Sequence, residues 1–280
     1  TDIGGTRASI SMQAAEGLGL RAEDVIPTVV DTDSIGYTDV TGGSRTTYAT
    51  GWAAVKAAED VRDQMIERAA AIWELDAKDI ELHEGAFRSR QDPELNMTFA
   101  KLSERLNDTG GPIVGRGAID AGGLGVGGGS FAGNIVDVEI DPDTGKVQIL
   151  RYTAFLDAGQ AVHRVYVEGQ MQGGALQGAG WALNEGYIFN EDGSIANSTF
   201  LDYRMPTSLD LPMIDTEIIE VPNPRHPFGV RGVGEAPIIA PPAAIANAIY
   251  HATGVRMTSL PMSPESVLAA INLNDRQQAK

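Results

Sequence analysis

Apolar residues recur every three to four positions in several stretches of the chain, which is the spacing of one face of an amphipathic helix. In the first stretch, Ile10, Ala14 and Leu18 follow this spacing, and Gly19 is placed to end the helix. Pro241 opens a later stretch at a position where a helix tolerates proline. The predicted helices cover residues 6–20, 51–73, 99–106, 165–183, 241–253 and a last segment that begins at Ser263-Pro264.

Other stretches are β-like, with alternating apolar and polar residues or runs of β-branched ones. Residues 135–140 and 147–152 are two such stretches, and the Asp-Pro-Asp-Thr-Gly sequence at 141–145 predicts a hairpin between them. Strands are also expected over residues 25–32 and 214–221. Long helices mixed with antiparallel strands indicate an α+β fold of two mixed subdomains rather than a doubly wound sheet.

Glycine is very dense between residues 110 and 133. Such a segment cannot form a regular helix or a strong strand. It is either a mobile linker between two subdomains or a loop that approaches a ligand or a partner closely. We place a boundary here, which gives a first subdomain over residues 1–125 and a second over residues 126–280.

Composition and charge exclude several classes of partner. The chain has 280 residues, of which 42% are hydrophobic, so it can bury a sizeable core. Its 38 acidic and 21 basic residues give a formal charge of -17, which repels nucleic acid and anionic membranes. With no cysteine, the chain can build neither a disulfide nor a thiolate metal site, and a reducing, cytoplasmic setting is expected. A first residue other than Met suggests a processed chain, a split subunit or a truncated sequence.

Three polar, glycine-rich segments are candidates for chemistry. The first, Thr41–Thr47, stands directly before a predicted helix start. Backbone N–H groups at such a turn, with the side chains of Ser44, Arg45 and Thr46, suit a phosphate or another polar ligand. An ordinary loop with a helix cap explains the same pattern equally well.

The second segment, Glu168–Gly178, places glycines inside a predicted helix, where each costs stability relative to alanine. Two explanations stay open. The glycines serve tight helix packing, or they let a ligand approach whose heterocyclic edge Gln170 reads with its donor and acceptor groups.

The third segment runs from Gly229 to Pro237 and sets Glu235 between glycines and an apolar, proline-rich run. With little bulk beside it, Glu235 can face a cavity, and apolar surroundings would raise its pKa toward the range of a general base. The alternative is a solvated acid in a turn. No His-x-x-x-His pair, Gly-x-Ser-x-Gly elbow or Walker-type loop offers another chemistry.

Taken in order, these segments resemble the C-terminal half of the large subunit of molybdenum hydroxylases, the family of xanthine dehydrogenase and aldehyde oxidase. The resemblance spans almost the whole chain, although Gly4-Gly5 lacks the Gln that many members have between these glycines, and His163-Arg164 replaces an Asn-Pro pair. The matching segments are Thr1–Arg7 with Ala14–Gly19, Gly43–Thr47, Val138–Val147, Val167–Gly178, Leu201–Thr207 and Gly232–Glu235.

The resemblance implies a molybdopterin-binding oxidoreductase. In this family the cofactor, as molybdopterin or a dinucleotide of it, holds the molybdenum, so no protein metal ligand is expected. Glu235 is implied as the catalytic base that removes the proton of the attacking oxygen in the hydroxylation of an aldehyde or an N-heterocycle. The residues implied in cofactor binding are Gly4, Gly5, Thr6, Gly43, Ser44, Arg45, Thr46, Gln170, Gly232 and Gly234.

The resemblance also implies a hetero-oligomer. A companion chain would carry the N-terminal half of the molybdenum subunit, and electrons would leave through iron–sulfur clusters and FAD on partner chains. Two alternatives remain. Asp2–Thr6 also resembles the phosphate loop of sugar kinases with the actin-like fold, and the chain could be a structural half-subunit without catalysis.

Overall fold

The computed structural model describes residues 3–29, 31–34, 36–38, 40–119 and 129–278. Contacts divide the chain into two compact units. Unit 1 comprises residues 1–129 together with Pro222–Gly232, and unit 2 comprises Ser130–Val221 together with Val233–Lys280. Each unit is described by itself, and the division into domains at 1–125 and 126–280 stays a prediction.

Two helices form the centre of unit 1. Helix α1 covers Thr6–Leu18, and helix α2 covers Gly51–Trp73, close to the predicted bounds. Gly17 lies against Ala58, and Gln13 lies against Gly51, so residue numbers rise together along the contact and the two helices run parallel. The N-terminal ends of α1 and α2 are therefore at the same end of the pair.

The far end of α2 packs on a small sheet that the sequence pattern did not predict. The sheet has the order β1-β2-β3, with β1 at Ile80–His83, β2 at Ala86–Ser89 and β3 at Asn96–Thr98, and helix α3 follows at Phe99–Glu104. Phe87 is fully buried against Met65 and Leu102. These strands are too short for alternation of apolar and polar residues to reveal them.

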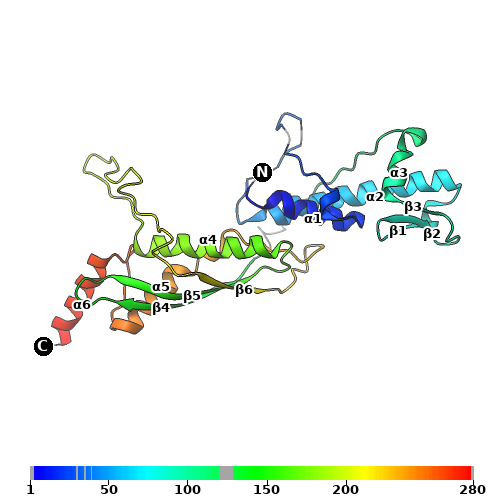
Figure 1. Ribbon diagram of the computed structural model, residues 1–280. Helices are drawn as coiled ribbons and strands as arrows, with labels where there is room; N and C mark the ends of the chain where they lie inside the picture. The colour runs from blue at the N-terminus through cyan, green and yellow to red at the C-terminus, as the bar shows by residue number, and fades with distance from the viewer. Residues whose placement is uncertain (1–2, 30, 35, 39, 120–128, 279–280) are drawn as a thin grey trace. The chain divides into compact units, whose positions relative to one another are not determined.

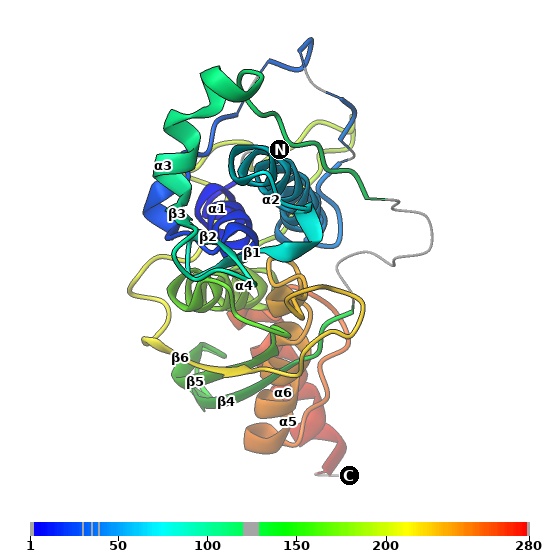
Figure 2. The same ribbon diagram turned by 90° about the vertical axis from the view of Figure 1, so that its right-hand side faces the viewer.

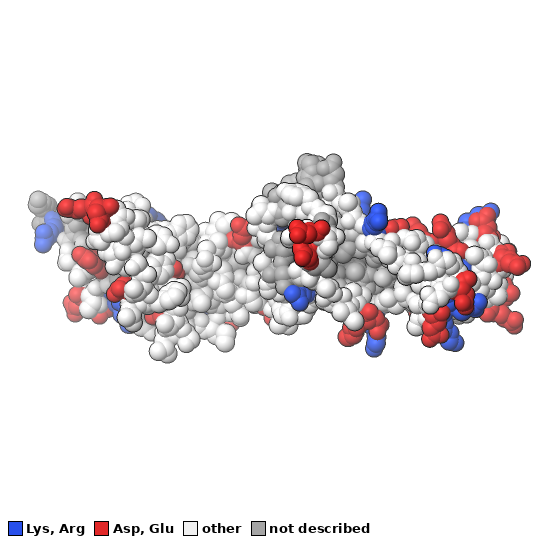
Figure 3. Space-filling model, turned by 90° about the horizontal axis from the view of Figure 1, so that it is seen from above, with Lys and Arg blue, Asp and Glu red and all other residues white. Residues whose placement is uncertain are grey.

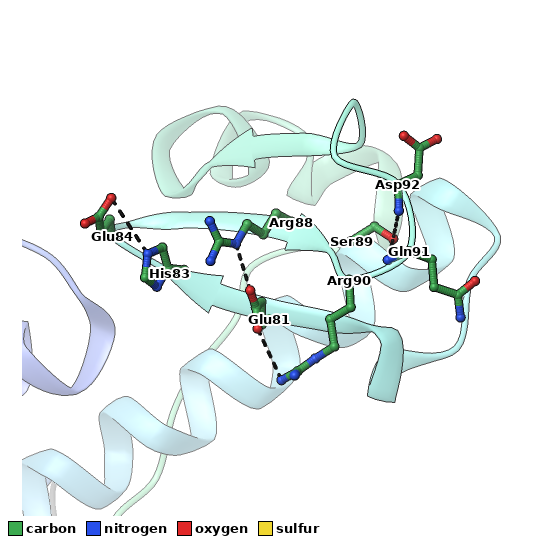
Figure 4. Close-up of polar contacts among 8 residues, drawn as sticks. All are labelled: Glu81, His83, Glu84, Arg88, Ser89, Arg90, Gln91 and Asp92. Carbon is green, nitrogen blue, oxygen red and sulfur yellow. Dashed lines mark hydrogen bonds and ion pairs between the residues drawn. The ribbon is translucent and has the colours of Figure 1, made fainter.

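Charged side chains form ion pairs on the exposed surface of the same sheet. Glu81 accepts a hydrogen bond from Nε of Arg88 at 2.8 Å and pairs with Arg90 at 3.4 Å (Figure 4). Figure 3 shows acidic side chains gathered over this end of unit 1, in keeping with the acidic composition of the chain. These ion pairs are partly exposed, so the buried side chains beneath them provide most of the stability of the sheet.

The connections of unit 1 are mostly irregular. Short 3₁₀ turns occur at Ala22–Asp24, Ala77–Asp79 and Leu106–Thr109. The strand expected over residues 25–32 was a wrong prediction, because the described residues of that segment form no strand and pair with no partner strand. An apolar run without a neighbouring edge cannot satisfy its backbone groups as a strand.

Unit 2 is built on a three-stranded sheet with the order β4-β5-β6. Strands β4, Ala132–Ile140, and β5, Val147–Asp157, form the predicted antiparallel hairpin, whose turn ends at Gly145 with a φ of 72°. Strand β6, Ile214–Ile219, pairs with β5 in parallel, which the expectation of antiparallel strands did not include.

Three helices complete unit 2, and all were predicted. They are α4 at Arg164–Leu183, α5 at Pro241–Thr253 and α6 at Pro264–Gln278. Helices α4 and α5 cover one face of the sheet, as Figure 2 shows, and enclose a core of Tyr152, Leu156, Met171, Ile245 and Ile249. Helices pack on one face of a small mixed sheet in unit 2 and with a small antiparallel sheet in unit 1, which confirms the α+β class.

The glycine-rich segment is only partly described, because residues 120–128 lie outside the described residues. In the described part, Gly115 and Gly117 lie so close to the backbone of α2 that a Cβ at either would overlap the carbonyls of Ala57 and Ala53. Close approach to a helix of the same unit accounts for these two glycines, and the choice between a linker and a loop that approaches a ligand or a partner stays untested. Within the described residues, no helix is both long and apolar enough to cross a membrane.

Candidate functional site: two helix starts in unit 1 and a carboxylate loop in unit 2

The loop before α1 presents backbone rather than side chains. Gly5 caps the helix with a φ of 82°, a left-handed conformation that glycine adopts without strain. The hydroxyl of Thr6 turns back to donate to the carbonyl of Ile3 at 2.7 Å. A Cβ on Gly4 would meet nothing within 4 Å, so the space beside this loop is open. The open space therefore adjoins the backbone of Gly4, whereas the buried Thr6 donates its N–H to the carbonyl of Ile3 at 3.1 Å.

The loop before α2 has the same character. Gly43 and Ser44 both have positive φ angles, 62° and 59°, and Arg45 returns to the right-handed region at -75°. Such an alternation points successive N–H groups to one side and forms a nest for anions. A π-helical turn at Thr46–Thr50 follows and continues into α2. π-helical turns of this kind occur often at functional sites.

A hydroxyl contact fixes the nest internally. The side-chain oxygens of Thr41 and Thr46 lie 2.8 Å apart, so the two ends of the loop are joined by a hydrogen bond. Thr46 is itself buried. The loop therefore has a defined shape that is largely set by its own backbone and hydroxyl groups.

Gly232, from a distant part of the sequence, packs closely against this nest. A Cβ at Gly232 would lie 2.8 Å from the carbonyl oxygen of Gly43 and 3.0 Å from Cβ of Ser44. No side chain fits there without displacement of backbone. The close approach explains why a glycine precedes the loop that carries Glu235.

His226 anchors the segment that carries Gly232, and sequence reasoning missed it. Its Nδ1 accepts from the N–H of Phe228 at 3.1 Å, which leaves the proton on Nε2 to donate to the carbonyl of Tyr48, also at 3.1 Å. The ring is buried and packs against the rings of Tyr48 and Trp52. Burial lowers the pKa of His226, and the hydrogen bond to Tyr48 acts in the opposite direction. An isolated histidine in the sequence carried no spacing signal for this role.

Parallel packing brings the two loops of unit 1 to one end of the helix pair. The Gln13 side chain, in the second half of α1, donates to the carbonyl of Thr47 at 3.0 Å, which joins α1 to the π-helical turn before α2. The predicted residues that the structure gathers in unit 1 are Gly4, Gly5, Thr6, Gly43, Ser44, Arg45, Thr46 and Gly232. They lie in the loops before the two helices and in the segment that contacts the second loop, and backbone N–H groups at such loops fit a phosphate-bearing or otherwise polar cofactor.

In unit 2, the glycines of α4 divide between the two explanations left open by the sequence. A Cβ on Gly174 would come to 2.5 Å from Pro237, and one on Gly178 to 2.5 Å from Pro241, so these two serve close packing. By contrast, a Cβ on Gly169 or Gly173 would meet nothing within 4 Å. The glycines on either side of the exposed Gln170 therefore leave an open surface beside it.

Glu235 is fixed to the same helix through its neighbour Pro237. It stands directly before a 3₁₀ turn, η5, at Ala236–Ile238, and Ile238 N–H donates to the Glu235 carbonyl at 3.3 Å. Pro237 is buried in the space that Gly174 leaves. The backbone of Gly234 and Glu235 is thereby tied to α4, the helix that carries Gln170.

The side chain of Glu235 itself is exposed. The apolar surroundings expected from the sequence are therefore not formed around it in the described structure. Gln170, Gly234 and Glu235 belong to unit 2, and the other predicted site residues belong to unit 1. Each unit thus presents its own part of the predicted set.

Glycine-shaped backbone loops before helix starts are a common form of phosphate-binding site. Residues 1–212 match the model of a family described as "Molybdopterin cofactor-binding domain". The match covers more than half of the chain, and the chain belongs to this family.

Individual relatives agree with this assignment. The chain is 32% identical over 276 residues to the gamma subunit of the 6-hydroxypseudooxynicotine dehydrogenase complex of Paenarthrobacter nicotinovorans, covering 95% of this chain and 34% of the relative. It is 30% identical over 282 residues to the xanthine dehydrogenase molybdenum-binding subunit of Escherichia coli, covering 98% of this chain and 37% of that one. The chain thus spans about a third of the length of these relatives.

The fold is also shared with a solved structure. CO dehydrogenase from Oligotropha carboxidovorans superposes with a TM-score of 0.84 at 25% identity, over 98% of this chain and 35% of that one. The sugar-kinase alternative was wrong, because helix α1 follows Thr6 where that fold has the second strand of a hairpin, and because the chain belongs to a different family. The comparisons do not support the structural half-subunit either.

Proposed function

We propose that this chain forms the C-terminal, molybdopterin-binding part of the large subunit of a molybdenum hydroxylase. The observation that carries the proposal is the pair of glycine-shaped loops at the starts of α1 and α2, in a chain of the molybdopterin-binding family. When bound, the cofactor supplies the water-derived oxygen and accepts the two electrons of the oxidation. The protein would bind and orient the cofactor and the substrate, and it would remove a proton from the attacking oxygen.

In this proposal, unit 1 holds the pterin and its phosphate or nucleotide tail. The backbone N–H groups at Gly4–Gly5 and at Ser44–Thr46 would donate to phosphate oxygens, and the Arg45 side chain would add charge. Gly4, Gly43 and Gly232 would give the backbone close access, while Gln170 and Gly234 of unit 2 would contact the pterin. A tail that carries more phosphate groups, as in a dinucleotide, would use more of these donors.

Glu235 would act as the general base. Its carboxylate would take the proton of the oxygen that attacks an electron-poor carbon of the substrate, a role that typically contributes about 10²–10⁴ in rate. Because the side chain is exposed in this chain, the water-excluding walls around it would come from the rest of the large subunit. The tie of Glu235 to α4 through Pro237 would keep its backbone in place when those walls assemble.

The proposed substrate is an aldehyde or an N-heterocycle. Two relatives, the 6-hydroxypseudooxynicotine and xanthine dehydrogenases, are named for nitrogen heterocycles, which supports the second class. Both are named as subunits, so we propose a cytoplasmic hetero-oligomer in which the rest of the molybdenum subunit, iron–sulfur clusters and FAD lie outside this chain. Electrons would leave through those groups.

The test is Glu235→Gln in the complete enzyme. The variant keeps the size and hydrogen-bonding shape of the side chain but cannot take a proton, so turnover of an aldehyde or N-heterocycle should fall about 10²–10⁴-fold at unchanged molybdenum content. Metal analysis and single-turnover reduction of the enzyme by substrate measure the two quantities.

The matched control is Glu217→Gln, an exposed carboxylate on β6 of the same unit. It should leave both turnover and molybdenum content unchanged. Turnover of Glu235→Gln within a factor of three of wild type would reject Glu235 as the base and favour a structural role for the chain.

A further inference from the structure

Between α4 and β6, residues 186–213 form an extended arm. Figure 1 shows it as the yellow-green loop that rises from the C-terminal end of α4, on the side away from the sheet. Its base is fixed to that end of the helix. The hydroxyl of Tyr203 donates to Glu185 at 2.7 Å, and Pro206 lies over Gly180, whose missing Cβ leaves room for it.

Hydrogen bonds, rather than a buried hydrophobic core, hold the arm in its conformation. Asn197 donates to the carbonyl of Gly186 at 2.7 Å and accepts from the N–H of Ile188 at 2.9 Å. Three carboxylates close its turns: Asp192 accepts from Ser194, Asp202 from Thr199 and Asp210 from Thr207. With polar groups satisfied inside the arm, its apolar side chains are left pointing outward.

Those apolar side chains are large and exposed. Phe200, Leu201 and Leu209 expose 86%, 93% and 94% of their surface. The other exposed apolar residues of the arm are Tyr187, Ile188, Phe189, Ile195, Met205 and Met213. Aromatic residues and methionine are the types enriched in the cores of protein interfaces, and contiguous exposed apolar surface marks an interaction site. The arm also has the length that one side of a stable interface uses, about 20–30 residues.

Charge indicates what covers the arm. It carries four acids, Glu191, Asp192, Asp202 and Asp210, and a single basic residue, Arg204. A second copy of the arm would bring like charges together, and an anionic membrane would repel it. The surface that fits is apolar with a basic rim.

We propose that the arm docks on the part of the molybdenum-binding subunit that lies outside these 280 residues. The relatives extend for about two thirds of their length beyond the segment that this chain matches, which supplies a covering partner of sufficient size. The inference rests on the proposed role of the chain as part of such a subunit. It adds that the arm, a feature of unit 2 without any predicted cofactor residue, is a main contact between the two parts.

The first experiment places a photo-crosslinking residue at Leu209 in the complete protein as its host produces it. Mass spectrometry then identifies the crosslinked peptides. We expect them to come from the remainder of the molybdenum-binding subunit. The same residue at Leu273 on α6, which is exposed but off the arm, serves as the control and should yield far less of this product.

Other outcomes overturn the proposal. Crosslinks to another copy of the arm, to an iron–sulfur or flavin chain, or to residues within these 280 would each name a different neighbour, and absence of crosslinks would mean an uncovered arm. Molybdenum content is measured in the same preparation. A crosslink to the remainder without molybdenum would keep the docking and reject the proposed function, whereas molybdenum without that crosslink would do the reverse.

A second experiment uses substitution. Hydrogen exchange of arm amides in the complete protein should be at least tenfold faster in a Phe200→Ser, Leu201→Ser, Leu209→Ser variant than in wild type, with Leu273→Ser as the matched control. Unchanged exchange in the triple variant would overturn the proposal. If that variant does not fold, the crosslinking result alone still decides.

Discussion

The two units differ in how their predicted site residues are held: unit 1 uses close backbone contacts at glycine, and unit 2 presents exposed polar side chains. In unit 1, the predicted cofactor residues lie in the loops before α1 and α2 and at Gly232, which approaches the Gly43-Ser44 nest too closely to admit a side chain. In unit 2, Gln170 and Glu235 are exposed side chains, and the contact of Gly174 with Pro237 joins the helix that carries Gln170 to the turn that follows Glu235. Unit 1 holds its loops through its own contacts, whereas unit 2 presents exposed groups whose surroundings, in the proposed function, come from the rest of the large subunit.

Gly232→Ala should have the largest effect on cofactor binding by unit 1. The new Cβ would lie 2.8 Å from a backbone oxygen of Gly43, so the nest would have to open. We expect molybdenum content to fall more than tenfold while the helices remain, since the change is confined to one loop contact. Metal analysis and circular dichroism measure the two effects.

Gly133→Ala is the matched control for this substitution. Gly133 lies on β4, and a Cβ there would meet nothing within 4 Å. This variant should keep its molybdenum. Full molybdenum in Gly232→Ala would show that the nest does not contribute to cofactor binding.

Helix α4 carries both kinds of glycine, one that packs closely on a neighbour and one with open space beside it. Gly174→Ala would press on Pro237 and displace the turn that carries Glu235, so we expect turnover to fall and the free energy of unfolding to drop by about 1–3 kcal/mol. Gly169→Ala has open space and should instead raise helix stability by up to about 1 kcal/mol. Urea unfolding and steady-state turnover compare the two variants. Equal effects at both positions would refute the division of these glycines into packing and open ones.

Elements specified by local sequence were predictable, whereas those formed by contacts between distant residues were not. Helices such as Gly51–Trp73 and the hairpin around Asp141–Gly145 were predictable because local spacing and turn chemistry specify them. The short strands β1–β3 were not, since tertiary pairing forms them. Likewise, the motifs named Gly232 and Glu235, but no local pattern linked Gly232 to Gly43 or His226 to Tyr48, which are far apart in sequence.

The smallest expected effect concerns His226, which tests whether the loop of unit 1 is held by its own contacts. His226→Leu removes the acceptor for Phe228 N–H and the donor to Tyr48, so unit 1 should lose about 1–3 kcal/mol of stability. Because its pKa is lowered in the folded state, wild-type His226 stays neutral where the unfolded chain begins to take up a proton. Wild-type stability should therefore fall as pH drops through about 6.5, the ordinary histidine pKa.

Urea unfolding at pH 7.5 and 5.5 separates this effect from the carboxylates, which titrate mostly below that window. His226→Leu should lose part of the pH dependence seen in wild type. His251→Leu is the matched control, because His251 is exposed on α5 and lies outside unit 1, and its replacement should leave the stability at pH 7.5 unchanged. An unchanged slope in His226→Leu would contradict the assignment of this pH dependence to the buried His226 ring.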